Sequence, residues 1–454
     1  MWTDERKEKI RKIAKALVFA TGLCLVVSCM DKIFTAKNSA SKMTSFFDKK
    51  EDYDVLFVGI SHMKYGIYPM ELWQDYGIAS FNLGEAGTRM PTNYWILRNA
   101  LDYVSPELVV IDSRKIDVDE MTYETYVNAV FDEMPLTRTK YEAAVDLFHT
   151  WELRMEFLFP FLKYHGRWTE LNKNDFLTTE YQLNRGADFY EGDQLRVAIP
   201  EEHSYIPKED KTEGGALSIA YLRKMIELCQ SRGIEVMLVE LPFPADEESQ
   251  RLANGVTDIA DAYGIHYINF LQMKDAINFR TDMRDSGAHV NDSGAKKVTS
   301  YLGKFITETY DIPDRRNESK YDAWNRDGQI YTEYKFDRIR EQSDLDKYLM
   351  LLSDKRVEAE IGIKEGSAVL EDERLMELIR NVYFYESEDT MCIQPLKNQE
   401  KDTADVWIRV TDAVTGNVED EASFCIDEGS GNLKAVRVKE NQECLQTETR
   451  MSVE

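Results

Sequence analysis

The sequence predicts an α/β protein built on a three-layer, doubly wound parallel sheet. Short apolar runs alternate along the chain with stretches whose apolar residues recur at helical spacing. The apolar runs are continuous, which is typical of strands that helices bury on both faces. Right-handed crossovers between such strands place helices on both sides of the sheet. Ligands of proteins with this architecture bind beyond the edge at which the strands end.

Five apolar runs account for the predicted sheet, and helical stretches follow or separate them. The predicted strands are residues 54–61, 78–84, 107–113, 235–243 and 265–270. The predicted helices are residues 68–77, 91–106, 214–233, 246–263 and 296–310. We therefore expect one α/β domain over residues 54–316.

Two other segments of the chain break the alternation. Residues 119–212 contain an aromatic stretch at 151–176, and we expect a helical insertion with its own small core, an interpretation compatible with a substrate lid or binding surface. The polar residues 317–329 are interpreted as a linker. Residues 330–454 are expected to form a smaller α+β domain with a β-hairpin around Thr415 and Gly416, and no catalytic motif is evident there.

Composition and charge narrow the classes of partner. The chain has 454 residues, with 56 Lys and Arg against 82 Asp and Glu, for a formal net charge of −26. Nucleic acid is therefore not an expected partner, because it would be repelled. Six cysteines are scattered without C-x-x-C spacing, which argues against a zinc site; one disulfide among Cys392, Cys425 and Cys444 would fit.

The N-terminus differs from the rest of the chain. Residues 5–15 carry six basic side chains, and residues 16–30 that follow are uncharged. A basic flank before an apolar run orients the N-terminus inside the cell, so we expect the body of the chain to be extracytoplasmic. Residues 1–35 are interpreted as a single-pass anchor that uses residues 16–34, and residues 36–53 as a polar linker. Two alternatives are a lipoprotein lipidated at Cys29, because residues 26–29 resemble a lipobox, and a cleaved secretion signal.

Side chains suited to acyl transfer lie at the predicted strand ends. Ser61 ends the first strand, Gly87 follows the second, and Asp285 and His289 come before the last helix. A nucleophilic serine needs a base, a carboxylate that orients the base, and amide donors for the oxyanion. We expect Ser61 as nucleophile, His289 as base, Asp285 as its orienting carboxylate and the amide of Gly87 in the oxyanion hole.

His62 is the alternative base because it is adjacent to Ser61. Successive residues of a strand point to opposite sides, so the His62 ring is expected to point away from the Ser61 hydroxyl. This geometry favours His289.

Residues 52–312 resemble the SGNH (GDSL-like) hydrolase superfamily. Gly59-Ile60-Ser61 resembles its nucleophile block, with Ile60 where Asp is usual, and Asn82-x-Gly84-x-x-Gly87 resembles its second block. Asp285 to His289 resembles the final Asp-x-x-His block with one extra residue. The ending His289-Val-Asn291 is similar to that of membrane-anchored bacterial members, including DltD of teichoic-acid D-alanylation and alginate-type polysaccharide O-acetylases. The resemblance implies a flavodoxin-like SGNH fold.

The third block of that family, Gly-x-Asn-Asp, is missing after the third predicted strand. Asn93 from the predicted helix 91–106, or Arg114 or Lys115, could supply a replacement donor for the oxyanion; alternatively, the two basic residues are surface charges.

The resemblance implies an extracytoplasmic serine esterase or O-acyltransferase that acts on a cell-envelope polysaccharide or teichoic-acid-like polymer. It also implies a membrane-bound O-acyltransferase as partner, with no metal or organic cofactor. The alternative is a non-catalytic binding or assembly subunit of such an acylation complex.

Overall fold

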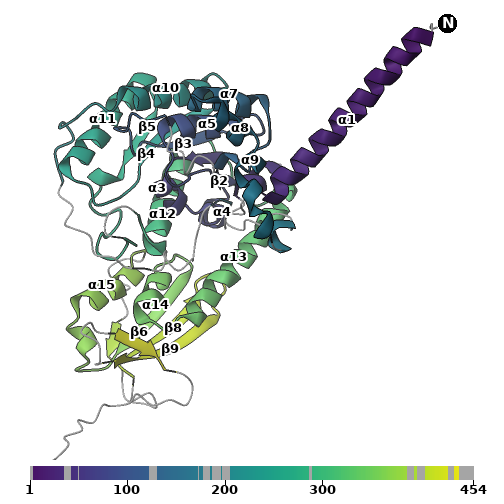
Figure 1. The fold of residues 1–454 in the computed structure, drawn as a ribbon. Coiled ribbons are helices and arrows are strands. Elements are labelled where there is room, and N and C mark those ends of the chain that lie inside the picture. The colour runs from purple at the N-terminus through teal and green to yellow at the C-terminus, as the bar shows by residue number, and fades with distance from the viewer. Residues whose placement is uncertain are drawn as a thin grey trace, which may run out of the picture.

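The computed structural model comprises an α/β body, a smaller C-terminal domain and a long N-terminal helix (Figure 1). The structure describes residues 4–34, 42–49, 51–121, 130–171, 173–176, 185–186, 196, 205–285, 289–385, 393–395, 404–427 and 434–438.

The body contains a five-stranded parallel sheet in the order β2-β1-β3-β4-β5. Its strands are β1 Val55–Val58, β2 Ser80–Asn82, β3 Leu108–Asp112, β4 Glu235–Glu240 and β5 His266–Asn269. This is the flavodoxin-like strand order, so the predicted doubly wound α/β fold is confirmed. The strand order reverses between β1 and β3, and the crevice beyond their ends is where such folds bind ligands.

Helices cover both faces of this sheet. They are α3 Ser61–Gly66, α4 Pro69–Tyr76, α5 Met90–Ala100, α10 Ala216–Gln230, α11 Glu247–Tyr263 and α12 Asp292–Thr309, with the short η3 Phe270–Gln272 after β5. Alternate strand residues face opposite sides. Leu56 and Val109 join the apolar cluster that contains residues of α5 and α10, whereas Val55 and Leu108 join the cluster that contains residues of α12.

The segment between β3 and α10 forms the predicted helical insertion. Its described elements are α7 Arg138–Leu147, α8 Trp151–Leu158, α9 Phe161–Tyr164, η1 His165–Thr169 and η2 Lys173–Phe176. Phe131, Phe148 and Phe157 are buried against one another. They belong to the same apolar cluster as α5, so the insertion extends the main core instead of enclosing a separate one.

Two segments interpreted as linkers are partly helical. In the first, residues 36–53, α2 Lys42–Lys49 buries Met43, Phe46 and Phe47 in the main core. In the second, residues 317–329, η4 Ser319–Tyr321 leads into the helix α13 Asp322–Glu341. The linker interpretation of 317–329 is wrong because the polar residues form the outer side of a helix whose Trp324 and Tyr331 are buried.

The C-terminal domain is α+β, as predicted. Its elements are α14 Leu345–Leu352, β6 Val357–Ile363, η5 Ala368–Leu370, α15 Glu373–Val382, β7 Ile393–Pro395, β8 Val406–Asp412, β9 Val418–Asp427 and β10 Lys434–Arg437. The sheet order is β10-β9-β8-β6-β7. β8 and β9 form the predicted hairpin, with Gly416 at φ 71° in its turn. Cys425 is disulfide-bonded.

A buried cluster of charges joins the two domains. Lys335 Nζ of α13 lies 3.0 Å from Glu71 Oε1 of α4 and 2.9 Å from Asp354 Oδ2. Lys296 Nζ of α12 lies 2.8 Å from Asp354 Oδ2 and 2.8 Å from Asp292 Oδ2. Burial opposes the charge of Lys296, but these carboxylates outweigh burial and raise its pKa well above the ordinary value.

The N-terminal helix α1, Asp4–Phe34, projects away from the body (Figure 1). Residues 6–34 are long and apolar enough to cross a membrane, a property that signal sequences share. The end of α1 contacts α9, η1 and η2 of the insertion.

Replacing Lys335 with Met is expected to destabilise the fold, because the substitution leaves the buried carboxylate of Glu71 without its ion-pair partner. Removing one member of a buried pair costs about 3–5 kcal/mol. The urea midpoint of unfolding, followed by circular dichroism, measures the effect. In the matched control Lys304→Met, the lysine side chain is 70% exposed, so its loss should cost less than about 0.5 kcal/mol. Equal midpoints for the two variants would contradict the importance of this cluster.

Candidate active site

Ser61 lies at the start of a helix that follows the first strand. β1 ends at Val58, and α3 begins at Ser61, with the extended residue Ile60 at the N-cap. The amides in the first turn of a helix have no partner within the helix, so they are available to a ligand. The serine hydroxyl and these amides therefore occupy one end of the same short helix.

Gly59 is required here by the close approach of β3. A Cβ atom on Gly59 would lie 2.4 Å from Cβ of Asp112, closer than two carbon atoms can approach. The Asp112 carboxylate accepts the amide of Ile60 at 3.4 Å and the amide of Arg114 at 3.1 Å. Asp112 thereby ties the residue before Ser61 to the end of β3.

A short loop before α12 carries Asp285 and His289. Met283 and Val290 form an antiparallel bridge, and the Arg284 amide donates to the His289 carbonyl at 3.0 Å. The loop ends at Asn291, whose side chain caps α12 by accepting the Gly294 amide at 3.1 Å. These contacts hold the acid and the imidazole relative to the rigid end of α12.

Ser61, His289 and Asp285 form one continuous chain of hydrogen bonds. Ser61 Oγ lies 2.8 Å from His289 Nε2, and His289 Nδ1 lies 2.7 Å from Asp285 Oδ2. Asp285 Oδ1 also accepts the His289 amide at 3.0 Å. An ionised carboxylate only accepts hydrogen bonds, so Nδ1 carries the proton and Nε2 accepts from the serine hydroxyl. This tautomer is the one that a general base requires.

His62 lies beside His289. From the sequence, His62 is expected at the end of a strand, but the structure places it in helix α3. Ser61 and His62 belong to a helix, so the rule for successive strand residues does not apply. The His62 ring centroid is 5.0 Å from that of His289 and 5.6 Å from that of Phe243. Neither His62 ring nitrogen has a hydrogen-bond partner among the described residues.

The residues considered for the oxyanion hole lie in three places. Gly87, at φ 72°, belongs to the loop after β2, which packs on the nucleophile strand through a 3.1 Å hydrogen bond from the Glu85 amide to the Gly59 carbonyl. Asn93 is buried in α5, and its side-chain amide has no partner within the described part of the chain. The Arg114 guanidinium stacks 3.7 Å from the centre of the Phe243 ring.

Asn82 connects the second strand to the nucleophile helix. Its side-chain nitrogen donates to the carbonyls of Met63 at 2.8 Å and Ile67 at 3.0 Å, while its side-chain oxygen accepts the Gly84 amide at 2.9 Å. A Cβ on Gly84 would lie 2.7 Å from the Lys64 amide nitrogen. The second motif thus holds the end of α3, which bears Ser61 at its start.

Two buried carboxyl groups lie at the ends of β3 and β4. Ser113 Oγ donates to Glu240 Oε2 at 2.5 Å. Burial, and then the charge of Asp112, raise the pKa of Glu240 to about 8. Burial raises the pKa of Asp112 to about 6. Glu240 is therefore protonated near neutral pH. The ends of β3 and β4 consequently carry less negative charge than their two acidic residues, Asp112 and Glu240, would suggest.

The C-terminal domain reaches the loop that bears the acid and the base. Asn381 of α15 donates to Asp282 Oδ1 at 3.1 Å and to Ser293 Oγ at 3.0 Å. Lys297 Nζ donates to Asp282 Oδ2 at 2.7 Å and also contacts the Asn381 side-chain oxygen. The Asn291 amide donates to the Asp282 carbonyl at 2.8 Å, so Asp282 forms the base of the loop.

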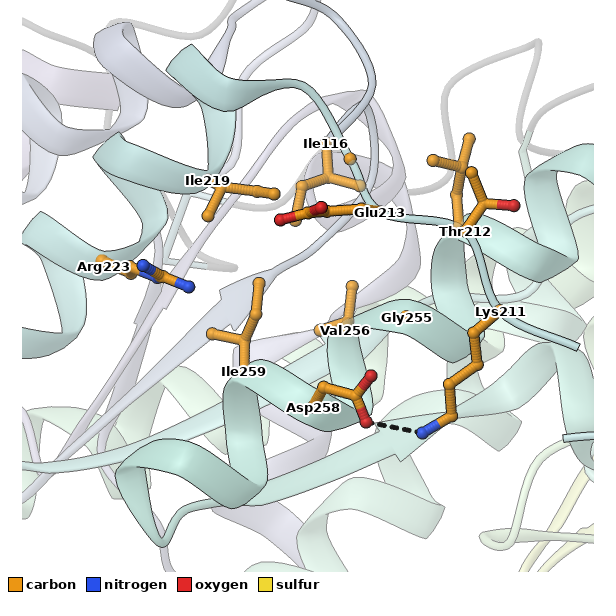
Figure 2. Close-up of a pocket in the computed structure, with 12 residues that line it drawn as sticks. Ile116, Lys211, Thr212, Glu213, Ile219, Arg223, Gly255, Val256, Asp258 and Ile259 are labelled. Carbon is orange, nitrogen blue, oxygen red and sulfur yellow. Dashed lines mark hydrogen bonds and ion pairs between the residues drawn. The ribbon is translucent and has the colours of Figure 1, made fainter. Parts of the chain in front are cut away.

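A cavity of about 310 Å³ lies apart from these residues, between α10 and α11 (Figure 2). Apolar side chains from both helices line it, and the ion pair between Lys211 and Asp258, at 2.6 Å, lies beside it. Ser61, Asp285 and His289 do not line this cavity. Within the described residues, no group of three or more His, Cys, Asp or Glu side chains could hold a metal ion.

The fold and the site define a flavodoxin-like α/β protein with a serine–histidine–aspartate chain at the end of its sheet. No family model matches the sequence, and no curated protein matches it. Among solved structures, the chain is similar to "a putative acylhydrolase" from Bacteroides fragilis, with a TM-score of 0.30 and 13% identity, covering 60% of this chain and 95% of that one. A likeness of this size carries no argument about activity.

The raised pKa of Glu240 makes stability depend on pH. Between about pH 4.5 and 8, an unfolded glutamate has lost its proton while the folded Glu240 still holds it. Raising the pH through this window therefore favours the unfolded state. Relative to Glu240→Gln, the wild type should lose on the order of a few kcal/mol of unfolding free energy from pH 5 to 8. Urea unfolding at several pH values measures this difference; parallel profiles would contradict it, and the exposed control Glu247→Gln should run parallel to the wild type.

Asn381 is expected to act as a positioning residue for the loop that carries Asp285 and His289. In Asn381→Leu, Asp282 and Lys297 lose a buried partner and the loop shifts, so Ser61 should react about 10- to 100-fold more slowly with a fluorophosphonate. The labelling rate is compared with that of Arg380→Gln, an exposed neighbour on α15, which should label at the wild-type rate. Thermal unfolding confirms that both variants are folded at the assay temperature. Unchanged labelling of a folded Asn381→Leu protein would refute the positioning role.

Proposed function

We propose that the chain is an extracytoplasmic serine acyl-transfer enzyme that acts on ester-linked acyl groups of a cell-envelope polymer. The observation that carries the proposal is the hydrogen-bond chain from Ser61 Oγ through His289 to Asp285, with distances of 2.8 and 2.7 Å. A serine, a histidine in the accepting tautomer and an orienting carboxylate are the parts that nucleophilic acyl transfer needs.

The first half of the reaction forms an acyl-enzyme. Ser61 Oγ attacks the acyl carbonyl carbon as its proton passes to His289 Nε2, and Asp285 stabilises the resulting imidazolium. The tetrahedral intermediate collapses, the ester bond breaks, and His289 returns the proton to the leaving alcohol. In the second half, water or a sugar hydroxyl attacks the acyl carbon while His289 Nε2 takes its proton; the bond between Ser61 Oγ and the acyl carbon then breaks, and His289 returns the proton to Ser61 Oγ. The reaction therefore needs only these three side chains, the acyl ester and an acceptor, which is water or a sugar hydroxyl.

The oxyanion of the tetrahedral intermediate is assigned to main-chain donors. The amide of Ser61 lies at the start of α3, and the amide of Gly87 belongs to the neighbouring loop. Removing a side-chain donor from an oxyanion hole costs about 3 kcal/mol where it has been measured. Arg114 and Asn93 are the proposed replacements for the missing asparagine of the third block.

The proposed location follows from the two ends of the chain. The N-terminal helix has the length and composition of a membrane span, and the basic residues in its first turns orient the N-terminus inside the cell. The disulfide at Cys425 is of a kind that forms in oxidising compartments outside the cytosol. An envelope glycopolymer as substrate and a membrane-bound O-acyltransferase as partner rest on the family resemblance of the sequence motifs.

A non-catalytic binding or assembly subunit is the second candidate. The absence of an asparagine at the end of β3 favours it, because a family donor to the oxyanion is missing there. The hydrogen-bonded serine, histidine and aspartate favour the enzyme, because a binding subunit has no need of that geometry.

Hydrolysis of p-nitrophenyl acetate by the full chain in detergent tests the proposal. Ser61→Ala and His289→Ala should each lower the rate by about 1000-fold or more, since each removes a member that acts in one unit. Fluorophosphonate should label the wild type at Ser61.

His62→Ala is the control that separates the two histidines. This variant should retain the greater part of the activity, because His62 does not hydrogen-bond to Ser61. A wild type as inactive as Ser61→Ala, together with no labelling of Ser61, would refute the enzyme and favour the binding subunit. Loss of activity in His62→Ala with retention in His289→Ala would instead overturn the choice of base.

A further inference from the structure

Exposed aromatic and apolar side chains gather on the insertion, on and beside the elements that contact the end of α1. Trp168 of η1 is 70% exposed, Phe176 of η2 is 64% exposed and Leu162 of α9 is 36% exposed. Trp151 at the start of α8 is 69% exposed, and α8 packs against α9. These four residues are called the aromatic face. Apolar side chains exposed on neighbouring elements form the kind of surface that interaction sites use.

The end of α1 is held against the same elements. The Asp31 carboxylate accepts the amide of Phe161 at 2.9 Å, and the Phe34 carbonyl accepts from Arg167 Nη1 at 2.6 Å. Figure 1 shows α1 leaving the body beside α9 and projecting away from it. The position of α1 in a membrane therefore determines where the aromatic face lies.

The helix α1 is long enough to cross a membrane, but its uncharged run is shorter than the bilayer core. Its uncharged run, residues 16–30, has 15 residues, which at 1.5 Å per residue span about 22 Å. The hydrocarbon core of a bilayer is about 30 Å thick. A short span draws its flanking residues to the membrane boundary. Asp31 is the first flanking residue on the outer side, and its carboxylate is one of the groups that bind the insertion.

Two basic side chains near the aromatic face are paired with carboxylates within the protein. Lys163 Nζ lies 2.6 Å from Asp132, and Arg167 lies 2.9 Å from Asp175. The chain as a whole carries a formal charge of −26, so electrostatic attraction to anionic lipid is not available to it. Tryptophan favours the boundary between headgroups and acyl chains, where its apolar ring and its N–H are both accommodated.

We propose that the aromatic face rests in the outer interfacial layer of the membrane that α1 crosses. The inference rests on the membrane anchoring within the proposed function and is independent of the chemistry at Ser61. It assigns the insertion a role in orienting the body: α1 supplies attachment, and the aromatic face prevents the body from tilting about the end of α1. The lipid contact is apolar and does not require anionic headgroups.

Quenching of tryptophan fluorescence by brominated phosphatidylcholine tests the proposal on the full chain, reconstituted in vesicles. The chain has seven tryptophans; Trp73, Trp95 and Trp324 are buried in the protein. The double variant Trp151→Phe, Trp168→Phe should lose a large part of the quenchable fluorescence. The matched control Trp407→Phe, on β8 of the C-terminal domain, should leave the quenched component unchanged. Trp407 is partly buried, and circular dichroism checks that the variants are folded.

The possible outcomes distinguish membrane anchoring by α1 from membrane contact by the aromatic face. Protein that does not float with the vesicles would refute the membrane anchoring, and the face with it. If the protein floats with the vesicles but quenching is the same in the double variant and the wild type, the lipid contact of the aromatic face is refuted while the anchoring stands. The aromatic face would then be assigned to contact with a protein partner. Quenching that requires anionic lipid or disappears at high salt would overturn the apolar contact. Quenching in phosphatidylcholine alone that persists at high salt and drops in the double variant supports the proposal.

Discussion

The buried carboxylate of Asp282 is the contact on which the candidate active site depends. It accepts from the Asn278 amide at 2.7 Å, Ser293 Oγ at 2.9 Å, Lys297 Nζ at 2.7 Å and Asn381 Nδ2 at 3.1 Å. Because the donors come from three segments, the turn at Asn278, helix α12 and helix α15, a shift in any one of these segments leaves a buried charge incompletely paired. Such an imbalance is costly in a dry interior. Asp282 therefore has one well-defined position, and it fixes both described ends of the segment that carries the acid Asp285 and the base His289.

This dependence makes the C-terminal domain part of the site rather than an appendage. Asn381 completes the pairing of Asp282, and Lys335 and Asp354 join the domains through a second buried charge cluster. Interfaces between independent domains are usually more open to solvent. Here, two sets of buried charges would have to be exposed together for the domains to separate. Rigid docking of this kind suits a site whose base and nucleophile lie on segments 228 residues apart.

The sheet could be predicted from the sequence because each of its strands is a continuous apolar run, and that pattern is local. The grouping of Ser61, Asp285 and His289 could also be predicted from the sequence, since the ends of parallel strands lie at one edge of the sheet. Elements that depend on packing were harder to predict. The polar residues 317–329 include the start of a helix, but only one face of that helix is buried, so its sequence is mostly polar. Asn381 carries no sequence signal, because a buried asparagine looks like any surface asparagine until its partner, 99 residues away, is known.

The histidine next to the nucleophile is tolerated because it carries no charge. Burial first, and then the charges of Arg114 and His289, lower the pKa of His62 well below its ordinary value. A cation at this position, 5.0 Å from the His289 ring, would oppose the imidazolium that His289 becomes in the proposed reaction. A neutral ring instead lies between His289 and Phe243. The His289 ring then has the Asp285 carboxylate as its hydrogen-bonded charge partner at Nδ1, which leaves Nε2 facing Ser61.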